Sequence, residues 1–178
     1  MISMNEKFPD FKLTGVISDS DDTSKSFKEY SNNSFPGKWK IVFFWPKDFT
    51  FVCPTEMVAF NNLYEDFQAS NAEVLGASVD SDFVHLAWRQ SHKDLKDLKF
   101  PMLSDIHRSL SKDLGILDQE AGVSKRATFI VDPDNNIRFI YVTDLSVGRD
   151  PKEVLRVLNA LQTEQLCPAS WSVNDPTL

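Results

Sequence analysis

The sequence predicts a layered α/β domain in which helices pack on a mixed β-sheet. Two short apolar runs, residues 41–45 and 73–79, are typical of strands that are buried on both faces. After Pro54 the apolar residues change to a helical period. The turn sequence 132–136 separates two further apolar runs, which indicates a hairpin. Strands and helices that alternate in this way favour a sheet covered by helices.

The first half of the chain alternates strands and helical segments. Residues 11–16 are expected to form a short strand, and 41–45 a strand bounded by Lys40 and Pro46. The strand at 73–79 is rich in small and β-branched residues. Between the last two strands, one apolar stripe at helical spacing is made of Met57, Phe60, Leu63, Tyr64 and Phe67.

Two helices and an extended segment follow the second buried strand. The first helix is expected over 82–92, with Asp82 as its possible N-cap. Its inward side chains are expected to be Phe83, Leu86 and Ala87. Residues 100–105 are expected to form a short extended segment, and residues 106–114 another short helix.

A hairpin and a helix complete the chain. Residues 127–131 and 137–142 are expected to pair antiparallel across the turn. Asp150 can cap the last helix, Pro151 suits its first position, and Glu153 completes a capping-box-like pattern. The apolar stripe of this helix is Val154, Leu155, Leu158 and Leu161. Among small architectures, the thioredoxin-like fold matches this order of elements best.

Composition limits the classes of function. The chain has 178 residues and no repeat or linker, so we expect one domain over 1–178. Its net charge of −7 argues against nucleic-acid binding. The amino-terminal residues lack an apolar run, and no stretch is long enough to span a bilayer, which predicts a cytoplasmic protein. The acidic run 19–22 lacks the pattern of an EF-hand, and the three histidines lack metal-ligand spacing, so we expect no metal or cofactor.

Cys53 is the first candidate for chemistry. It stands where a buried strand joins a long helix, so unpaired N–H groups and the positive end of the helix dipole favour a thiolate there. Thr50 lies three residues earlier, close enough to face the same space. Such a thiolate suits attack on a peroxide. A buried free cysteine that acts only as a small apolar residue is the alternative on spacing alone.

A longer motif supports the chemical interpretation. The string Pro-x-x-x-Thr-x-x-Cys-Pro-Thr-Glu at 46–56 resembles the active-site signature of the peroxiredoxins, in the alkyl hydroperoxide reductase C and typical two-cysteine branch. Further segments look like family segments in family order, and together they cover nearly the whole chain: 74–81, 83–88, 100–105, 126–132 and 147–149.

The resemblance implies a role for each matching residue. Cys53 would be the peroxidatic cysteine, and Thr50 and Arg126 would bind the peroxide oxygens and stabilise the thiolate. Pro46 would shield the pocket from water. Two supporting residues, Glu56 and Arg149, would orient Arg126. Without the resemblance, the arginines would read as surface ion pairs of little energetic weight.

The same resemblance assigns the second cysteine. Cys167 would lie in a tail from about residue 163 and would attack the Cys53 sulfenic acid of the other subunit, giving an intersubunit disulfide. From its position in the sequence alone, Cys167 would be a single thiol with no function. The implied partners are a hydroperoxide, a second copy in a dimer and a ring of dimers, and a dithiol protein that resembles alkyl hydroperoxide reductase D or thioredoxin. Similar tails often carry another cysteine where this chain has Ala169, which leaves the reductant open.

Two other classes of function compete with a peroxidase. A thioredoxin-type oxidoreductase needs Cys-x-x-Cys, and position 56 is Glu. A holdase-type chaperone or a peroxide-signalling assembly is left open as a second activity. His85 could be a general base or a metal ligand, but we expect a structural or interface histidine instead. Trp88 shares its helical face, and we expect it to pack near the active-site rim or at a subunit contact.

Overall fold

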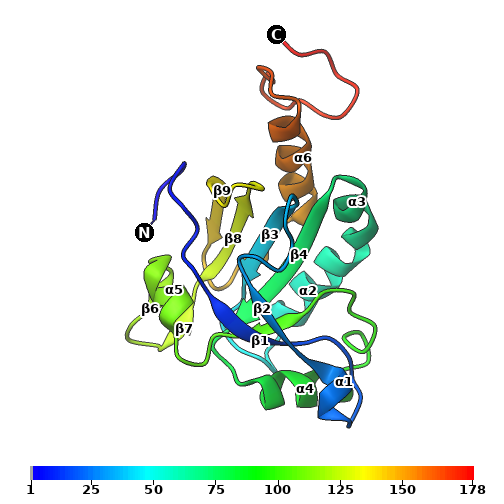
Figure 1. The fold of residues 1–178 in the computed structure, drawn as a ribbon, viewed down its shortest axis with the longest axis vertical. Helices are drawn as coiled ribbons and strands as arrows, with labels where there is room; N and C mark the ends of the chain where they lie inside the picture. Colours follow the sequence, from blue (N-terminus) through cyan, green and yellow to red (C-terminus); the bar gives the residue numbers. More distant parts are fainter. Residues whose placement is uncertain (1) are drawn as a thin grey trace.

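A computed structural model describes residues 2–178, and its centre is a mixed seven-stranded sheet (Figure 1). The strand order is β2-β1-β5-β4-β3-β8-β9, and β6 and β7 form a separate two-stranded ribbon. The elements in chain order are β1 (Lys12–Val16), α1 (Thr23–Ser26), β2 (Phe27–Ser31), β3 (Trp39–Phe44), α2 (Val52–Asn62), α3 (Tyr64–Ala69), β4 (Ala72–Ser78), α4 (Asp82–Ser91), β5 (Met102–Ser104), α5 (Ser109–Asp113), β6 (Leu117–Asp118), β7 (Val123–Ser124), β8 (Arg126–Val131), β9 (Ile137–Thr143) and α6 (Pro151–Gln162).

The central strand β3 is buried on both faces, as predicted. It pairs parallel with β4 and antiparallel with β8. Successive side chains point to opposite faces of a strand. Ile41 and Phe43 therefore belong to one apolar core with residues of α2, α3, α4 and α6. Val42 and Phe44 belong to a second core with the N-terminal segment and α5. This arrangement confirms the predicted mixed sheet flanked by helices.

The helix α4 differs from its prediction in its cap and its inward face. Ser81 is the N-cap, and its hydroxyl accepts a hydrogen bond from the Val84 N–H, so the prediction of Asp82 as the cap was wrong. Phe83 is 62% exposed and Ala87 is exposed, whereas Leu86 is buried as predicted. The Phe83 ring packs edge-on against Phe27 of β2 instead of entering the core. The buried face of α4 consists of His85, Leu86, Trp88 and Arg89.

Two other helical predictions needed correction at their boundaries. The stripe that begins at Met57 is divided between α2 and α3, which meet at Leu63. The helix expected from residue 106 begins only at Ser109, because Arg108 takes a left-handed φ of 59° and interrupts the helix there. The elements α1, β2, β6 and β7 were not predicted at all.

The last helix agrees with its prediction at the N-terminus. The Asp150 carboxylate accepts a hydrogen bond from the Lys152 N–H, and Pro151 is the first helical residue. Glu153 does not complete a capping box, because its carboxylate is paired with Arg156. After α6 the chain forms a projecting C-terminal segment at the top of Figure 1. No helix among residues 2–178 is both long enough and apolar enough to cross a membrane.

Candidate active site around Cys53

Cys53 is the second residue of α2, at the end of the loop that leaves β3. The predicted position at a helix start is confirmed. The N-cap residue, Phe51, makes no side-chain capping hydrogen bond, so no side chain competes for the first-turn N–H groups. The Cys53 side chain is buried, with 1% of its surface exposed. A sulfur at this place lies at the positive end of the dipole of an 11-residue helix.

Thr50 brings a hydroxyl to this sulfur. Its Oγ1 lies 2.9 Å from Cys53 Sγ and 2.9 Å from the carbonyl oxygen of Lys47. The hydroxyl has a single proton, so it donates to one of these acceptors at a time. A negative charge on the sulfur would draw that proton toward Sγ, because hydrogen bonds to charged acceptors are the stronger ones.

Arg126 approaches the sulfur from β8. Its Nη1 lies 3.4 Å from Cys53 Sγ and 2.7 Å from Glu56 Oε2. Its Nε donates to the carbonyl oxygen of Leu145 at 2.7 Å. The guanidinium is therefore held at two further points while one N–H group faces the sulfur. The Leu145 contact escaped sequence reasoning, because a backbone carbonyl contact leaves no signal in residue type.

Arg149 and Glu56 form the second part of the arrangement. The Arg149 backbone N–H and Nε donate to Glu56 Oε1 at 2.9 and 2.7 Å, and Nη2 donates to Oε2 at 3.0 Å. Arg149 Nη1 also donates to the carbonyl oxygen of Ala127 at 2.6 Å, which ties the pair to β8. Glu56 thus lies between the two arginines, and all three side chains are buried.

The charges of this cluster favour an anion at the sulfur. Two guanidinium groups and one carboxylate leave one positive charge uncompensated beside Cys53. Burial lowers the pKa of Arg126, but the hydrogen bond and charge of Cys53 and the charge of Glu56 outweigh it and raise that pKa. Burial raises the pKa of Glu56, but hydrogen bonds and charge from Arg149, with the charge of Arg126, bring it below its usual value.

A hollow of about 300 Å³ opens onto the sulfur. Pro46 is buried and lines this hollow together with Thr50, Cys53 and Arg126. Phe51, at the rim, is 94% exposed. The structure therefore brings six of the seven predicted site residues together: Pro46, Thr50, Cys53, Glu56, Arg126 and Arg149. No group of three or more potential metal ligands occurs among residues 2–178.

We expect the Glu56→Gln chain to be less stable than the wild type at neutral pH, by about 3 kcal/mol, because the substitution leaves buried arginines without their carboxylate. The pKa of Glu56 is lowered in the folded state, so its contribution is present above the unfolded-state pKa and is lost as pH falls through the folded-state pKa. The stability difference between the two chains should therefore shrink at acid pH. Urea unfolding at both pH values checks this, and an equal difference at both would contradict it.

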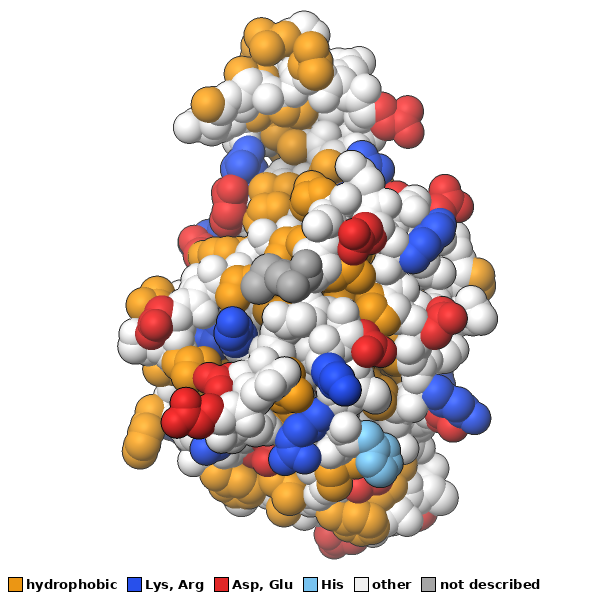
Figure 2. All heavy atoms as spheres, turned by 90° about the vertical axis from the view of Figure 1, so that its left-hand side faces the viewer, with side chains coloured by type: hydrophobic (Ala, Val, Ile, Leu, Met, Phe, Trp, Pro, Cys, Tyr) orange, Lys and Arg blue, Asp and Glu red, His pale blue; other side chains and the backbone are white. Residues whose placement is uncertain are grey.

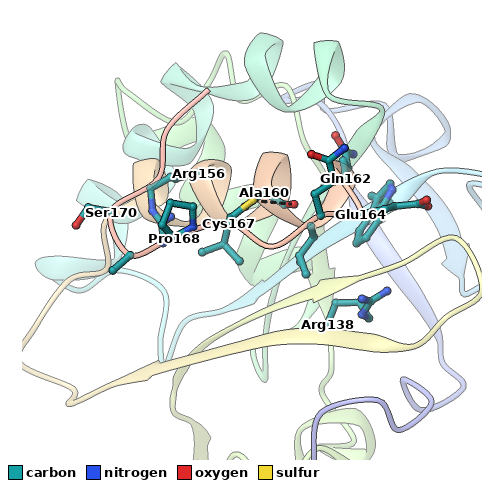
Figure 3. A pocket seen from close by; sticks show the side chains of 13 residues that line it. Arg138, Arg156, Ala160, Gln162, Glu164, Cys167, Pro168 and Ser170 are labelled. Atoms are coloured by element: carbon teal, nitrogen blue, oxygen red, sulfur yellow. Dashed lines mark hydrogen bonds between the residues drawn. The ribbon is translucent and has the colours of Figure 1, made fainter. Parts of the chain in front are cut away.

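The seventh residue, Cys167, lies apart from the others. Cys167 lies in the C-terminal segment that follows α6. It lines a groove of about 890 Å³ between this C-terminal segment, α6 and Trp39, the first residue of β3 (Figure 3). Its Sγ lies 3.4 Å from Thr163 Oγ1 and 3.8 Å from the carbonyl oxygen of Ala160. Arg156 and Arg138 line the same groove, and Cys167 is partly exposed.

The two sulfurs lie near opposite ends of the central strand β3. Pro46, just beyond the end of β3, lines the hollow with Cys53, whereas Trp39 at the start of β3 lines the groove with Cys167. Six residues of extended strand span about 20 Å. A disulfide needs Cα atoms within about 7 Å of each other. Both cysteines are free thiols, and bonding them within one chain would require a large rearrangement.

The C-terminal segment closes on itself and exposes apolar side chains. The N–H of Leu178 donates to the carbonyl oxygen of Leu166 at 2.9 Å, and Arg156 Nη1 donates to the carbonyl oxygen of Trp171 at 3.0 Å. Leu166, Val173 and Leu178 are 73%, 54% and 84% exposed. Figure 2 shows apolar side chains gathered on the projecting part of the molecule at the top of the view.

Comparisons with known proteins agree on one family. The model of the AhpC/TSA family matches residues 4–140. The chain is 49% identical to alkyl hydroperoxide reductase C of Mycolicibacterium smegmatis, with 100% of this chain and 94% of that protein covered. It is 43% identical to peroxiredoxin 1 of Brugia malayi, with 97% and 76% covered.

Solved structures give the same result for the fold. Mycobacterium tuberculosis AhpC matches with a TM-score of 0.88 and 48% identity, covering 96% of this chain and 99% of that one. The reduced 2-Cys peroxiredoxin of Plasmodium vivax matches with a TM-score of 0.90 and 34% identity, covering 99% and 93%. These matches confirm the predicted thioredoxin-like architecture.

Proposed function

Because the chain belongs to the AhpC/TSA family, and is therefore a peroxidase of the peroxiredoxin type, we propose that Cys53 is the residue that attacks the peroxide. The single observation that carries this assignment is the convergence of Thr50 Oγ1 and Arg126 Nη1 on a buried sulfur at a helix N-terminus. The substrate is a hydroperoxide, either hydrogen peroxide or an organic one.

The first step is a substitution at oxygen. The Cys53 thiolate attacks the distal oxygen of the hydroperoxide, the S–O bond forms and the O–O bond breaks. The departing oxygen takes up a proton and leaves as water or an alcohol, and Cys53 becomes a sulfenic acid. Arg126 and Thr50 donate hydrogen bonds where negative charge develops on the oxygens. Pro46 keeps water from the hollow, and Glu56 and Arg149 hold Arg126 in place.

The second step joins two chains. The thiolate of Cys167 from another copy attacks the sulfenic acid sulfur of Cys53, an S–S bond forms and the S–O bond breaks, and the departing hydroxyl takes up the proton that the Cys167 thiol had released and leaves as water. The separation of the two sulfurs across the sheet supports pairing between chains rather than within one. Because Cys53 is 1% exposed, the first turn of α2 must unwind to present its sulfur.

The chain is proposed to work as a homodimer that assembles into a ring of dimers. The segment from about residue 163 follows the end of α6 and carries Cys167, and it is hydrogen-bonded to α6 and within itself, which supports its role as a resolving tail within a single domain. The exposed side chains of Leu166, Val173 and Leu178 in this segment would become buried against a second copy of the chain.

An external dithiol protein then reduces the disulfide. The chain has only two cysteines, and position 169 is Ala, so no third thiol of its own can relay the electrons. A reductant that resembles alkyl hydroperoxide reductase D or thioredoxin would attack the Cys167 sulfur and release the Cys53 thiolate, which Arg126 stabilises. A reducing compartment such as the cytosol keeps both thiols available.

The assignment of Cys53 is tested by trapping its sulfenic acid. The Cys167→Ser chain is treated with one equivalent of hydrogen peroxide in the presence of dimedone, and the labelled residue is located by peptide mass spectrometry. We expect the adduct on Cys53, and none in the Cys53→Ser control. A wild-type chain that consumes no peroxide, or an adduct absent from Cys53, would contradict the proposal.

A further inference from the structure

A buried pair of titratable side chains lies just outside the hollow. His85 of α4 and Asp48, in the loop between β3 and α2, have side-chain exposures of 0% and 1%. His85 Nδ1 lies 2.6 Å from Asp48 Oδ2. His85 Nε2 lies 3.1 Å from the carbonyl oxygen of Leu103 in β5. The mechanism above uses neither residue, so this buried polar pair requires its own explanation.

The contacts determine how many protons the pair holds. A carbonyl oxygen only accepts, so His85 Nε2 carries a proton and donates it to Leu103. A second proton must lie between Nδ1 and Asp48 Oδ2, since two lone pairs at 2.6 Å would repel each other. The pair is therefore neutral overall. Both ring nitrogens are used, and the imidazole is fixed between α4, β5 and the loop.

Asp48 connects the fixed imidazole of His85 to the loop between β3 and α2. Its Oδ1 accepts a hydrogen bond from Trp45 Nε1 at 2.7 Å, and its backbone N–H donates to Asp80 Oδ2 at 2.9 Å. Asp80 is itself held through its Oδ2 by the Ser78 hydroxyl at 2.8 Å. The middle of the loop is thus attached to the end of β3, the end of β4 and α4.

The residue after Asp48 shows that this part of the loop is held in a strained form. Phe49 has a φ of 56°, in the left-handed region that bulky residues avoid. Its ring is 57% exposed and lies 6.0 Å from the ring of Trp88, so packing alone fixes it weakly. Such backbone strain persists only where neighbouring contacts enforce it. The next residue is Thr50, whose hydroxyl faces the Cys53 sulfur.

We infer that His85 is a positioning residue for the peroxidase reaction, because its Nδ1 hydrogen bond to Asp48 holds the strained loop that places the Thr50 hydroxyl on Cys53. The inference rests on the proposed function of Cys53. The imidazole touches neither the sulfur nor the hollow. Its effect passes from Nδ1 to Asp48, through Phe49, to Thr50, and it concerns the peroxide step rather than disulfide formation.

Two substitutions separate this role from packing. In His85→Asn the amide nitrogen can occupy the place of Nδ1, so the donor to Asp48 is kept and the donor to Leu103 is lost. In His85→Gln the amide nitrogen can reach the place of Nε2, so the donor to Leu103 is kept and the donor to Asp48 is lost. Each variant loses one buried hydrogen bond, so their losses of stability should be similar.

The second-order rate constant of Cys53 oxidation by hydrogen peroxide is measured for both variants by stopped-flow tryptophan fluorescence, with thermal unfolding measured in parallel. We expect His85→Gln to slow the reaction about tenfold or more, since a displaced catalytic hydroxyl loses its alignment. His85→Asn should stay within about twofold of the wild type. The later rate of disulfide formation should be unchanged in both.

Three results would overturn the inference: equal slowing in both variants, slowing in His85→Asn alone, or no slowing in either. If His85→Gln does not fold, Asp48→Ala replaces it, because a methyl group can accept a hydrogen bond from neither Trp45 nor His85. A normal rate in a folded Asp48→Ala chain would equally overturn the inference. Failure of the proposed function is distinguishable, since the wild-type chain would then show no Cys53-dependent peroxide reaction at all.

Discussion

Replacing Cys53 by serine is expected to reduce peroxide consumption by more than about 10⁴-fold, because a serine hydroxyl stays protonated and is a far weaker nucleophile than a thiolate. The positive environment of Arg126 and the helix N-terminus favours the anion of a thiol but does not ionise an alcohol. Consumption is measured with excess hydrogen peroxide and a dithiol reductant. Hydrogen bonds from Thr50 remain possible in this variant, so the loss reports the nucleophile itself.

The matched control for this change is Cys167→Ser. It keeps the Cys53 site intact, because position 167 lies near the opposite end of β3 from Cys53. We expect it to consume about one equivalent of peroxide per chain at the wild-type rate and then to stop in the absence of another thiol. Continued peroxide consumption by Cys53→Ser would show that another group carries the chemistry.

Replacing Arg126 by methionine is expected to slow Cys53 oxidation by about 10²- to 10³-fold, the usual cost of removing one preorganised donor from a developing anion. The same change removes the uncompensated positive charge beside the sulfur and leaves Glu56 with Arg149 alone. The planar guanidinium of Arg126 contacts Cys53, Glu56 and the Leu145 carbonyl at once. The compact ammonium group of a lysine cannot reach all three, so Arg126→Lys should recover only part of the lost rate. Stopped-flow fluorescence against peroxide concentration gives the rate constants.

Arg138→Met provides the control for general loss of charge. Arg138 lies in the groove of Cys167, pairs with Asp132 at 3.4 Å and makes no contact with the Cys53 cluster. We expect Cys53 in the Arg138→Met chain to be oxidised at the same rate as in the wild type. If Arg126→Met and Arg138→Met reacted equally fast, the role of Arg126 at the sulfur would be refuted.

The sequence predicted the elements that repeat a clear pattern. The run 41–45 is apolar at every position because β3 is buried on both faces, and Asp150 and Pro151 mark the start of α6 by local chemistry. The strand β2 was missed because it is a polar edge strand, with Lys28 and Glu29 exposed. Its two apolar residues, Phe27 and Tyr30, lie three positions apart and contact different cores, so they do not give the two-residue period of a half-buried strand.

The candidate site divides in the same way. The position of Cys53 at a helix start follows from the sequence, because the change from strand to helix is local. The meeting of Glu56, Arg126 and Arg149 joins residues up to 93 positions apart, and only resemblance to a family indicated it. Asp48 remained unnoticed because a single carboxylate in a loop is ordinary, and its meaning depends on a histidine 37 residues away.

Cys53 is proposed to pair with Cys167 of another chain, and mixing two variants that each keep one cysteine tests this pairing most directly. Cys53→Ser and Cys167→Ser chains are prepared separately, exchanged into mixed dimers under reducing conditions, freed of reductant and treated with one equivalent of peroxide. Each mixed dimer keeps one pair of Cys53 and Cys167, on opposite chains. On non-reducing electrophoresis we expect a covalent dimer that is joined through these two residues and appears only in the mixture. A mixture without such a dimer, while the wild-type chain forms its disulfide within single chains, would contradict the account.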